Sequence, residues 1–143
     1  MKSFVLDASV AAKWMLPAKN EPLRPEAFRL LDAYEAAEVS LLVPDIFWPE
    51  CGNIMRKAVR QGRVPRTEGE AAIELLLNRR IPTISSSELL LEAMAIALNF
   101  GRSVYDSLYV SLAAQTKNEL ITADEKLANT MAAQFPVKWL GAF

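Results

Sequence analysis

The sequence alternates short apolar runs with longer segments of helical periodicity, and this alternation constrains the fold more than any other feature. Short apolar runs bounded by turn or charged residues predict strands at residues 4–6, 39–43, 82–84, 119–122 and 136–139. Apolar residues spaced i, i+3, i+4 predict helices at residues 26–37, 46–61, 67–78, 87–100, 104–116 and 124–134. Continuous apolar strands that alternate with helices are typical of a parallel sheet covered on both faces. We therefore predict an α/β fold with five strands.

Local chemistry supports several of these boundaries. Pro25 suits the first turn of a helix, and Gly62 and Gly101 suit helix ends. Ser87 is placed to cap the helix that follows it. Residues 17–24, which contain two prolines and precede Pro25, are predicted to form a loop.

Length and composition indicate one globular domain over residues 1–143, with 52% hydrophobic and 23% charged residues. The apolar stretches are far shorter than the roughly 20 residues that cross a bilayer, and the N-terminus lacks the apolar region of a signal peptide. We expect a soluble, cytoplasmic protein. The single cysteine, Cys51, has no partner for an internal disulfide and is expected to be a small buried hydrophobe.

The chain contains no histidine, which excludes many kinds of active site. Catalytic triads and dyads that use imidazole are excluded, as are histidine-ligated zinc sites. One cysteine cannot form a thiolate zinc site. Chemistry at neutral pH would therefore depend on carboxylates, lysines, hydroxyls and a hard metal ion.

Two acidic residues directly follow predicted strands. Asp7 ends the first strand in Val-Leu-Asp-Ala-Ser, and Asp124 follows the fourth in Leu-Ile-Thr-Ala-Asp. Ligands of open parallel sheets bind just beyond the carboxyl ends of the strands, so both residues are candidate ligand-binding acids. The alternative is that each aspartate only caps the helix that comes next.

Two further acids lie within predicted helices among apolar neighbours. Glu50 is surrounded by Phe47, Trp48 and Cys51, and Asp106 lies in Val-Tyr-Asp-Ser-Leu-Tyr. A partly buried carboxylate has to be neutralised, paired or metal-bound. The alternatives are a first-turn acid that interacts with the helix dipole for Asp106, and for Glu50 a solvated position or a pair with Arg56 or Lys57.

If these four acids converge, their combined negative charge requires cations. Mg²⁺ or Mn²⁺ accepts ligand sets made only of oxygen, binds phosphates and generates a hydroxide nucleophile. The acids therefore indicate phosphodiester hydrolysis as the reaction class.

Four segments distributed along the chain carry these acids. They read Leu-Asp-Ala-Ser-Val, Pro-Asp-Ile-Phe-Trp-Pro-Glu-Cys-Gly-Asn, Val-Tyr-Asp-Ser-Leu-Tyr-Val-Ser-Leu-Ala and Leu-Ile-Thr-Ala-Asp-Glu-Lys-Leu. Together and in this order they resemble the PIN-domain ribonucleases, and within them the VapC-type toxins of bacterial and archaeal toxin–antitoxin pairs. The resemblance spans the whole chain.

The resemblance implies a metal-dependent endoribonuclease, the toxin of a type II toxin–antitoxin pair. It implies that the first and fourth strands are neighbours, that the chain forms a homodimer, and that a cognate antitoxin wraps the protein and blocks its metal site. Carried over residue by residue, the catalytic and metal-binding acids are Asp7, Glu50, Asp106 and Asp124. Ser9 and Thr122 are the hydroxyls that would support them. The number of metal ions and the RNA target stay open.

A net charge of −1 argues against general binding to polyanions, so contact with RNA would require a local patch. Arg56, Lys57, Arg60 and Arg63, followed by Arg66, form a basic segment without an acid. Spacing of i, i+4, i+7 would put three of the arginines on one helix face. The alternative is a solvated face that only aids solubility. Lys13, one or two turns after Asp7, is a weaker candidate, because helix lysines are commonly exposed.

Two other functions remain possible at this level. A Mg-dependent phosphohydrolase with an aspartyl nucleophile would also place an acid after the first strand, but those enzymes carry a second aspartate where this chain has Ser9. A non-catalytic binding module would use the acids only as caps and ion-pair partners. It would be neither stabilised nor activated by Mg²⁺.

Overall fold

The computed structural model describes residues 1–143 and contains one five-stranded parallel sheet with the strand order β3-β2-β1-β4-β5. The strands are β1 (Lys2–Leu6), β2 (Val39–Pro44), β3 (Thr83–Ile84), β4 (Glu119–Thr122) and β5 (Val137–Trp139). All five predicted strands are present, and their bounds differ by two residues at most. The first and fourth strands are neighbours, in agreement with the family resemblance.

Seven α-helices connect and cover the strands. They are α1 (Ala8–Met15), α2 (Arg24–Glu35), α3 (Phe47–Arg60), α4 (Arg66–Asn78), α5 (Leu90–Phe100), α6 (Val104–Thr116) and α7 (Glu125–Met131). Six match predicted segments, and α1 lies outside them. Ala8, Val10, Ala11 and Ala12 of α1 are all buried, so this short helix lacks the exposed polar positions that produce a helical period.

The predicted cap at Ser87 is wrong. Ser85 is the capping residue: its hydroxyl accepts the backbone N–H of Ser87 and starts a short 3₁₀ turn, Ser86–Glu88. Leu89 is fully buried, and α5 begins only after it, at Leu90. Pro25 does lie in the first turn of α2, and Gly62 and Gly101 have the left-handed backbone of helix ends, with φ of 75° and 66°.

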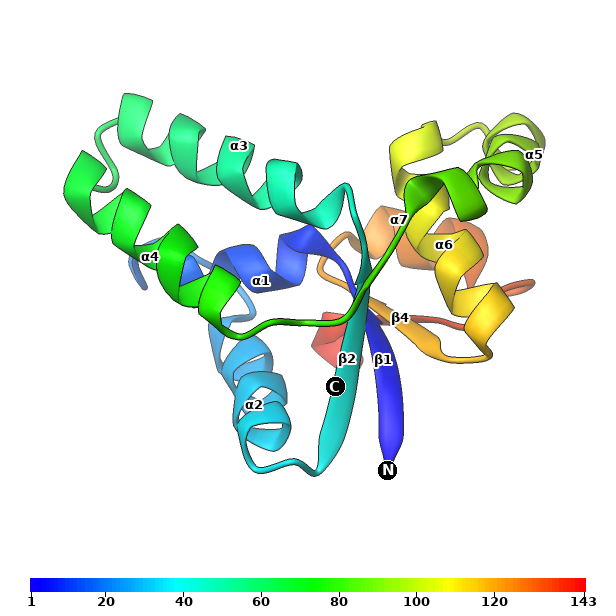
Figure 1. Cartoon of the computed structure of the whole chain (residues 1–143), viewed down its shortest axis with the longest axis horizontal. Helices are drawn as coiled ribbons and strands as arrows, with labels where there is room; N and C mark the ends of the chain where they lie inside the picture. Colours follow the sequence, from blue (N-terminus) through cyan, green and yellow to red (C-terminus); the bar gives the residue numbers. More distant parts are fainter.

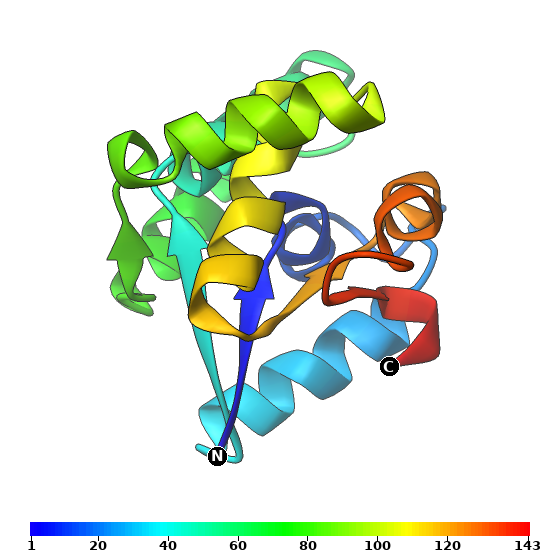
Figure 2. The same ribbon diagram turned by 90° about the vertical axis from the view of Figure 1, so that its right-hand side faces the viewer.

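The helices form layers on the two sides of the sheet. Helix α6 packs on β1, β2 and β4, and α5 packs across α6 (Figure 2). Figure 1 shows α5 and α6 on one side of the sheet, with α1 and α2 on the other. Helices α3 and α4 form a hairpin that extends away from the strands and contacts α1 (Figure 1). None of the helices combines the length and apolar character that crossing a membrane requires.

The central strands lie in the middle of the core. Val5 and Leu6 of β1 and Leu120 and Ile121 of β4 are completely buried. Burial on both faces explains why these strands read as continuous apolar runs instead of alternating patterns. Cys51 is also buried, as predicted, and desolvation raises the pKa of its thiol, which makes it unreactive.

A buried ion pair anchors the loop between α1 and α2. Lys13, a weak candidate for the site because helix lysines are commonly exposed, is buried on α1, where its ammonium lies 2.8 Å from the Glu21 carboxylate. Arg63, just beyond α3, approaches the other oxygen of Glu21 at 3.3 Å. The Lys13 side chain therefore holds the loop, because a buried charge is unfavourable unless it is paired, and its partner Glu21 lies in the loop.

We predict that Glu21→Gln lowers the free energy of unfolding by about 3 kcal/mol, because it leaves the Lys13 charge buried and unpaired. Urea denaturation measures the change. The control is Glu70→Gln, which removes an exposed partner of Arg66 and should cost less than about 1 kcal/mol. Equal effects of the two substitutions would contradict the structural role assigned to the Lys13–Glu21 pair.

Candidate active site

Asp7 lies at the carboxyl end of β1, where its backbone N–H donates to the carbonyl of Ile121 on β4 at 3.1 Å. Its side chain makes no capping hydrogen bond to α1, so the capping alternative is wrong for this residue. The Oδ2 atom instead accepts hydrogen bonds from Ser9 at 2.5 Å and Thr122 at 2.7 Å. The two hydroxyls named by the resemblance therefore both hold Asp7.

Asp124 is connected to Asp7 through Thr122. The Thr122 hydroxyl donates to Asp7 and accepts the backbone N–H of Asp124 at 3.0 Å. One carboxylate oxygen of Asp124 caps α7 by accepting the N–H of Leu127 at 3.1 Å, as the capping alternative predicted. The other oxygen faces Arg102. Asp124 is thus a helix cap that still presents one oxygen to the site.

Asp106 lies in the first turn of α6, where Ser103 caps the helix by accepting its backbone N–H. Its side chain is partly exposed and pairs with Arg102. The same guanidinium nitrogen, Nη2, is 3.0 Å from Asp106 and 3.1 Å from Asp124. Arg102 therefore bridges two of the predicted acids.

Glu50 lies in the first turn of α3 and faces α6. Its Oε1 atom accepts a hydrogen bond from the buried hydroxyl of Tyr109 at 2.5 Å. The proposed pairs with Arg56 or Lys57 do not form; Arg56 instead contacts Asn53 at 3.2 Å. Glu50 is half-buried and is turned towards the other acids.

The four acids interact electrostatically. Burial raises the pKa of Asp7, the hydrogen bonds from Ser9 and Thr122 lower it, and the charges of Asp106 and Asp124 raise it further. Burial likewise raises the pKa of Glu50, against the hydrogen bond from Tyr109, and the charges of Asp7 and Asp106 add to the rise. These charge effects agree with the hydrogen bonds through Thr122 and Arg102, which bring Asp7, Asp106 and Asp124 together near the carboxyl ends of β1 and β4.

Two residues of this region were missed in the sequence. Arg102 precedes Asp106 by four residues, and this spacing is typical of helix ion pairs. The spacing could therefore have predicted the pair with Asp106, but not the pair with Asp124. Tyr109 is buried and cannot stack on a base, and nothing in the local sequence links it to Glu50, which is 59 residues away.

The chemistry of the donor set fits Mg²⁺ or Mn²⁺, because the acids offer only carboxylate oxygen and two of them already face a cation, Arg102. No three acidic or cysteine side chains are close enough together to hold a metal ion in this arrangement. Joint ligation therefore requires side-chain movement, and Arg102 is the group that lies between Asp106 and Asp124.

The basic segment is only partly as predicted. Arg56, Lys57 and Arg60 are exposed on α3 and, with Gln61, line a polar hollow of about 370 Å³. Helix α3 ends at Arg60, so Arg63 is not on the same helix face, and its guanidinium is paired with Glu21. The hollow offers three unpaired positive charges to an anionic ligand.

The raised pKa of Asp7 leads to a pH-dependent prediction for Asp7→Asn. The folded protein holds the Asp7 proton more tightly than the unfolded chain, so ionisation removes stability as pH rises above the ordinary value of 3.8. Asparagine does not ionise. In chelator, the free energy of unfolding of Asp7→Asn relative to wild type should therefore increase between pH 4 and pH 7.5.

Urea denaturation across this pH range measures that difference. The control is Asp32→Asn, because Asp32 is exposed and remote from the site, and its difference from wild type should stay flat. A flat difference for Asp7→Asn as well would contradict the desolvation of Asp7.

Comparisons with known proteins agree with this architecture. The family model described as "PIN domain" matches residues 4–132. Ribonuclease VapC3 of Pyrobaculum aerophilum is 32% identical over 131 residues, which cover 90% of this chain and 95% of that protein.

Two solved structures share the fold. PAE2754 of Pyrobaculum aerophilum superposes with a TM-score of 0.74 at 18% identity, over 99% of this chain and 91% of that one. VapBC2 of Rickettsia felis, bound to a DNA fragment from its promoter, gives 0.66 at 13% identity over 96% and 98%. The extent of the family match, together with the VapC relative, shows that this chain belongs to the PIN domain family, among its VapC-type members.

Proposed function

We propose that the protein is a metal-dependent endoribonuclease, the toxin of a type II toxin–antitoxin pair, which hydrolyses RNA phosphodiester bonds. The observation that carries this proposal is the convergence of acids at one edge of the sheet: Thr122 joins Asp7 to Asp124, and Arg102 joins Asp124 to Asp106. Glu50 lies close enough for the charges of Asp7 and Asp106 to raise its pKa. The VapC relative that is named a ribonuclease supports the substrate class. The whole chain, residues 1–143, would act as the nuclease domain. We expect it to work in the cytoplasm, where RNA and an antitoxin would be present.

The four acids would share the catalytic and metal-binding roles. Asp7 has a fixed orientation, because Ser9 and Thr122 both donate to its Oδ2 and leave Oδ1 available. Asp106 and Asp124 each turn one oxygen to the same point. A bound Mg²⁺ or Mn²⁺ would supply charge neutralisation at the scissile phosphate and a lowered pKa for the attacking water.

Glu50 is the acid best placed to handle a proton. Its Oε1 is held by Tyr109, and its Oε2 has no hydrogen-bond partner within the chain. Burial raises its pKa, which makes its carboxylate a stronger base than an exposed glutamate. We assign to Oε2 the removal of a proton from the attacking water, in addition to a share in cation binding.

Arg56, Lys57 and Arg60 are the proposed RNA-binding residues, with Arg63 as a weaker contributor because of its pair with Glu21. The first three lie about two to three turns along α3 from Glu50. A phosphate backbone that follows α3 would thus meet positive charge and then the acids. Single-stranded RNA suits such an open surface.

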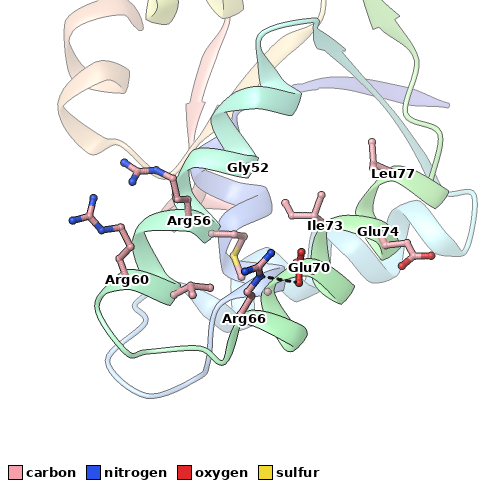
Figure 3. Close-up of a pocket in the computed structure, with 11 residues that line it drawn as sticks. Gly52, Arg56, Arg60, Arg66, Glu70, Ile73, Glu74 and Leu77 are labelled. Atoms are coloured by element: carbon pink, nitrogen blue, oxygen red, sulfur yellow. Dashed lines mark ion pairs between the residues drawn. The ribbon is translucent and has the colours of Figure 1, made fainter.

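A groove between α3 and α4 is the proposed site of the antitoxin. It has a volume of about 540 Å³, and its floor contains Met55, Val59 and Ile73. Figure 3 shows Arg56 and Arg60 on one rim and Glu74 on the other, with the Arg66–Glu70 ion pair at one end. An apolar floor between rims of opposite charge suits an amphipathic helix. The neighbour VapBC2 comes from a toxin–antitoxin system, which supports a protein partner.

Helix α5 carries the proposed homodimer surface. Four large apolar side chains of this helix are about half exposed or more: Leu90, Leu91, Met94 and Leu98. Leu91 is the most exposed, at 86%. Such a continuous apolar face on one helix is typical of an interface between protein chains. The second face of α5 already packs on α6, so the exposed side is available to another copy.

The phosphohydrolase alternative has less support. The position two residues after Asp7 is Ser9, and its hydroxyl is engaged in holding Asp7. The binding-module alternative is tested by the same experiment as the nuclease. A binding module predicts that Mg²⁺ neither stabilises the fold nor supports cleavage.

The decisive experiment is cleavage of mixed cellular RNA with Mg²⁺, with Mn²⁺ and with chelator. Asp7→Asn and Asp106→Asn should each reduce metal-dependent cutting by at least about 100-fold, since loss of even a supporting residue at a metal site typically costs 10- to 100-fold. The matched control is Asp32→Asn, an exposed acid on α2, which should cut like wild type. A folded wild type that cuts nothing with either metal would refute the nuclease proposal.

A separate prediction concerns the homodimer. Leu91→Glu should convert a dimer to a monomer, because it puts a charge at the most exposed position of the apolar face of α5. Light scattering after size-exclusion chromatography measures the mass. Leu75→Glu, which changes an equally apolar exposed residue on α4, should leave the dimer intact. Dissociation by both substitutions, or by neither, would contradict this assignment.

A further inference from the structure

Arg102 is the most tightly engaged cation near the acidic site. It lies in the short connection between α5 and α6, outside both helices, and its side chain is only 18% exposed. Its Nη2 atom donates to Oδ2 of Asp106 and to Oδ2 of Asp124. Other arginines in ion pairs, such as Arg66 and Arg79, each contact one acid that is more than half exposed. Arg102 alone bridges two acids.

The position of Nη2 is the important point. A nitrogen within hydrogen-bond distance of both carboxylates occupies the place from which one cation reaches both of them. A divalent ion bound by Asp106 and Asp124 together would need the same place, because carboxylate oxygens ligate such ions at about 2.0–2.6 Å. The guanidinium and the ion therefore exclude one another.

The environment of Arg102 is also incomplete. Its Nε is buried and has no hydrogen-bond partner. An unpaired buried donor on a charged group is unfavourable, so this position depends on the two carboxylates and not on a full set of hydrogen bonds. If a stronger cation takes the carboxylates, little else holds the side chain in place. Because Arg102 precedes α6, its side chain can move without breaking that helix.

We propose that Arg102 is an internal counter-cation that a divalent ion has to displace from Asp106 and Asp124. This competition from Arg102 sets the ion concentration at which the site fills. The proposal rests on the function proposed above, in which these acids bind the ion. Arg102 is then a positioning residue: its positive charge offsets the repulsion between the two carboxylates and so keeps them close together. Its competition lowers the apparent affinity by the fraction of molecules in which the acids are open.

The test measures Mn²⁺ binding by titration calorimetry, which does not depend on RNA cleavage. Arg102→Gln should bind Mn²⁺ at least about fivefold more tightly than wild type, because the competitor is gone. The matched control is Arg66→Gln, whose arginine pairs with Glu70 away from the site and which should bind like wild type.

A second measurement distinguishes displacement from a general effect of charge. The Hε signal of Arg102, identified by its loss in Arg102→Gln, is followed by NMR in the wild type during titration with Mg²⁺. Displacement should shift this signal and speed its exchange with water, whereas a purely structural arginine would keep both. If Arg102→Gln fails to fold, Arg102→Lys assigns the signal, and the titration is still made on the wild type.

The outcomes distinguish failure of the counter-cation role of Arg102 from failure of the metal site itself. Tighter Mn²⁺ binding by Arg102→Gln with a Mg²⁺-dependent Arg102 signal supports displacement. Equal or weaker binding by Arg102→Gln, or an Arg102 signal that Mg²⁺ does not change, overturns the counter-cation role and leaves the nuclease proposal intact. Absence of Mn²⁺ binding in both proteins overturns the metal site itself.

Discussion

The parallel pairing of β1 with β4 is the constraint on which the rest of the site depends. The register sets Leu6 beside Ile121, so the two strands end together and Asp7 emerges next to Thr122. The hydroxyl of Thr122 then joins Asp7 to the backbone of Asp124. Because Val5, Leu120 and their neighbours are completely buried, a slip in this register would expose core residues. The core therefore fixes the distance between two acids that are far apart in the chain.

Helix starts supply the remaining acids. Glu50 and Asp106 occupy the first turns of α3 and α6, where the positive end of the helix dipole favours a carboxylate. Each is held from a different direction, Glu50 by the hydroxyl of Tyr109 and Asp106 by Arg102. Four elements thus contribute one acid each. Burial opposes the charge on Asp7 and Glu50, and this opposition makes the pocket suited to a cation.

Much of the fold could be predicted from the sequence, because local periodicity and core burial agree along most of it. Strand β4 and helix α6 have the predicted bounds. Helix α1 was missed because burial of Val10, Ala11 and their neighbours erases its polar face. The four acids could be named from short motifs. The contacts of Lys13 with Glu21, of Tyr109 with Glu50 and of Arg102 with Asp124 could not, because they depend on which side chains the tertiary structure encloses.

Helix α3 connects surfaces that have been described separately. Its first turn carries Glu50, and the side that forms a wall of the groove against α4 carries Arg56 and Arg60 at the rim. Fourteen residues of helix form a rod about 21 Å long, so Glu50 and the groove wall belong to one continuous element. A ligand that changes the tilt of this rod at one end changes the position of Glu50 at the other. Thermodynamic reciprocity then requires the two effects to be equal. If a ligand in the groove changes the affinity of the acids for their ligand by some factor, a ligand at the acids changes the affinity of the groove by the same factor.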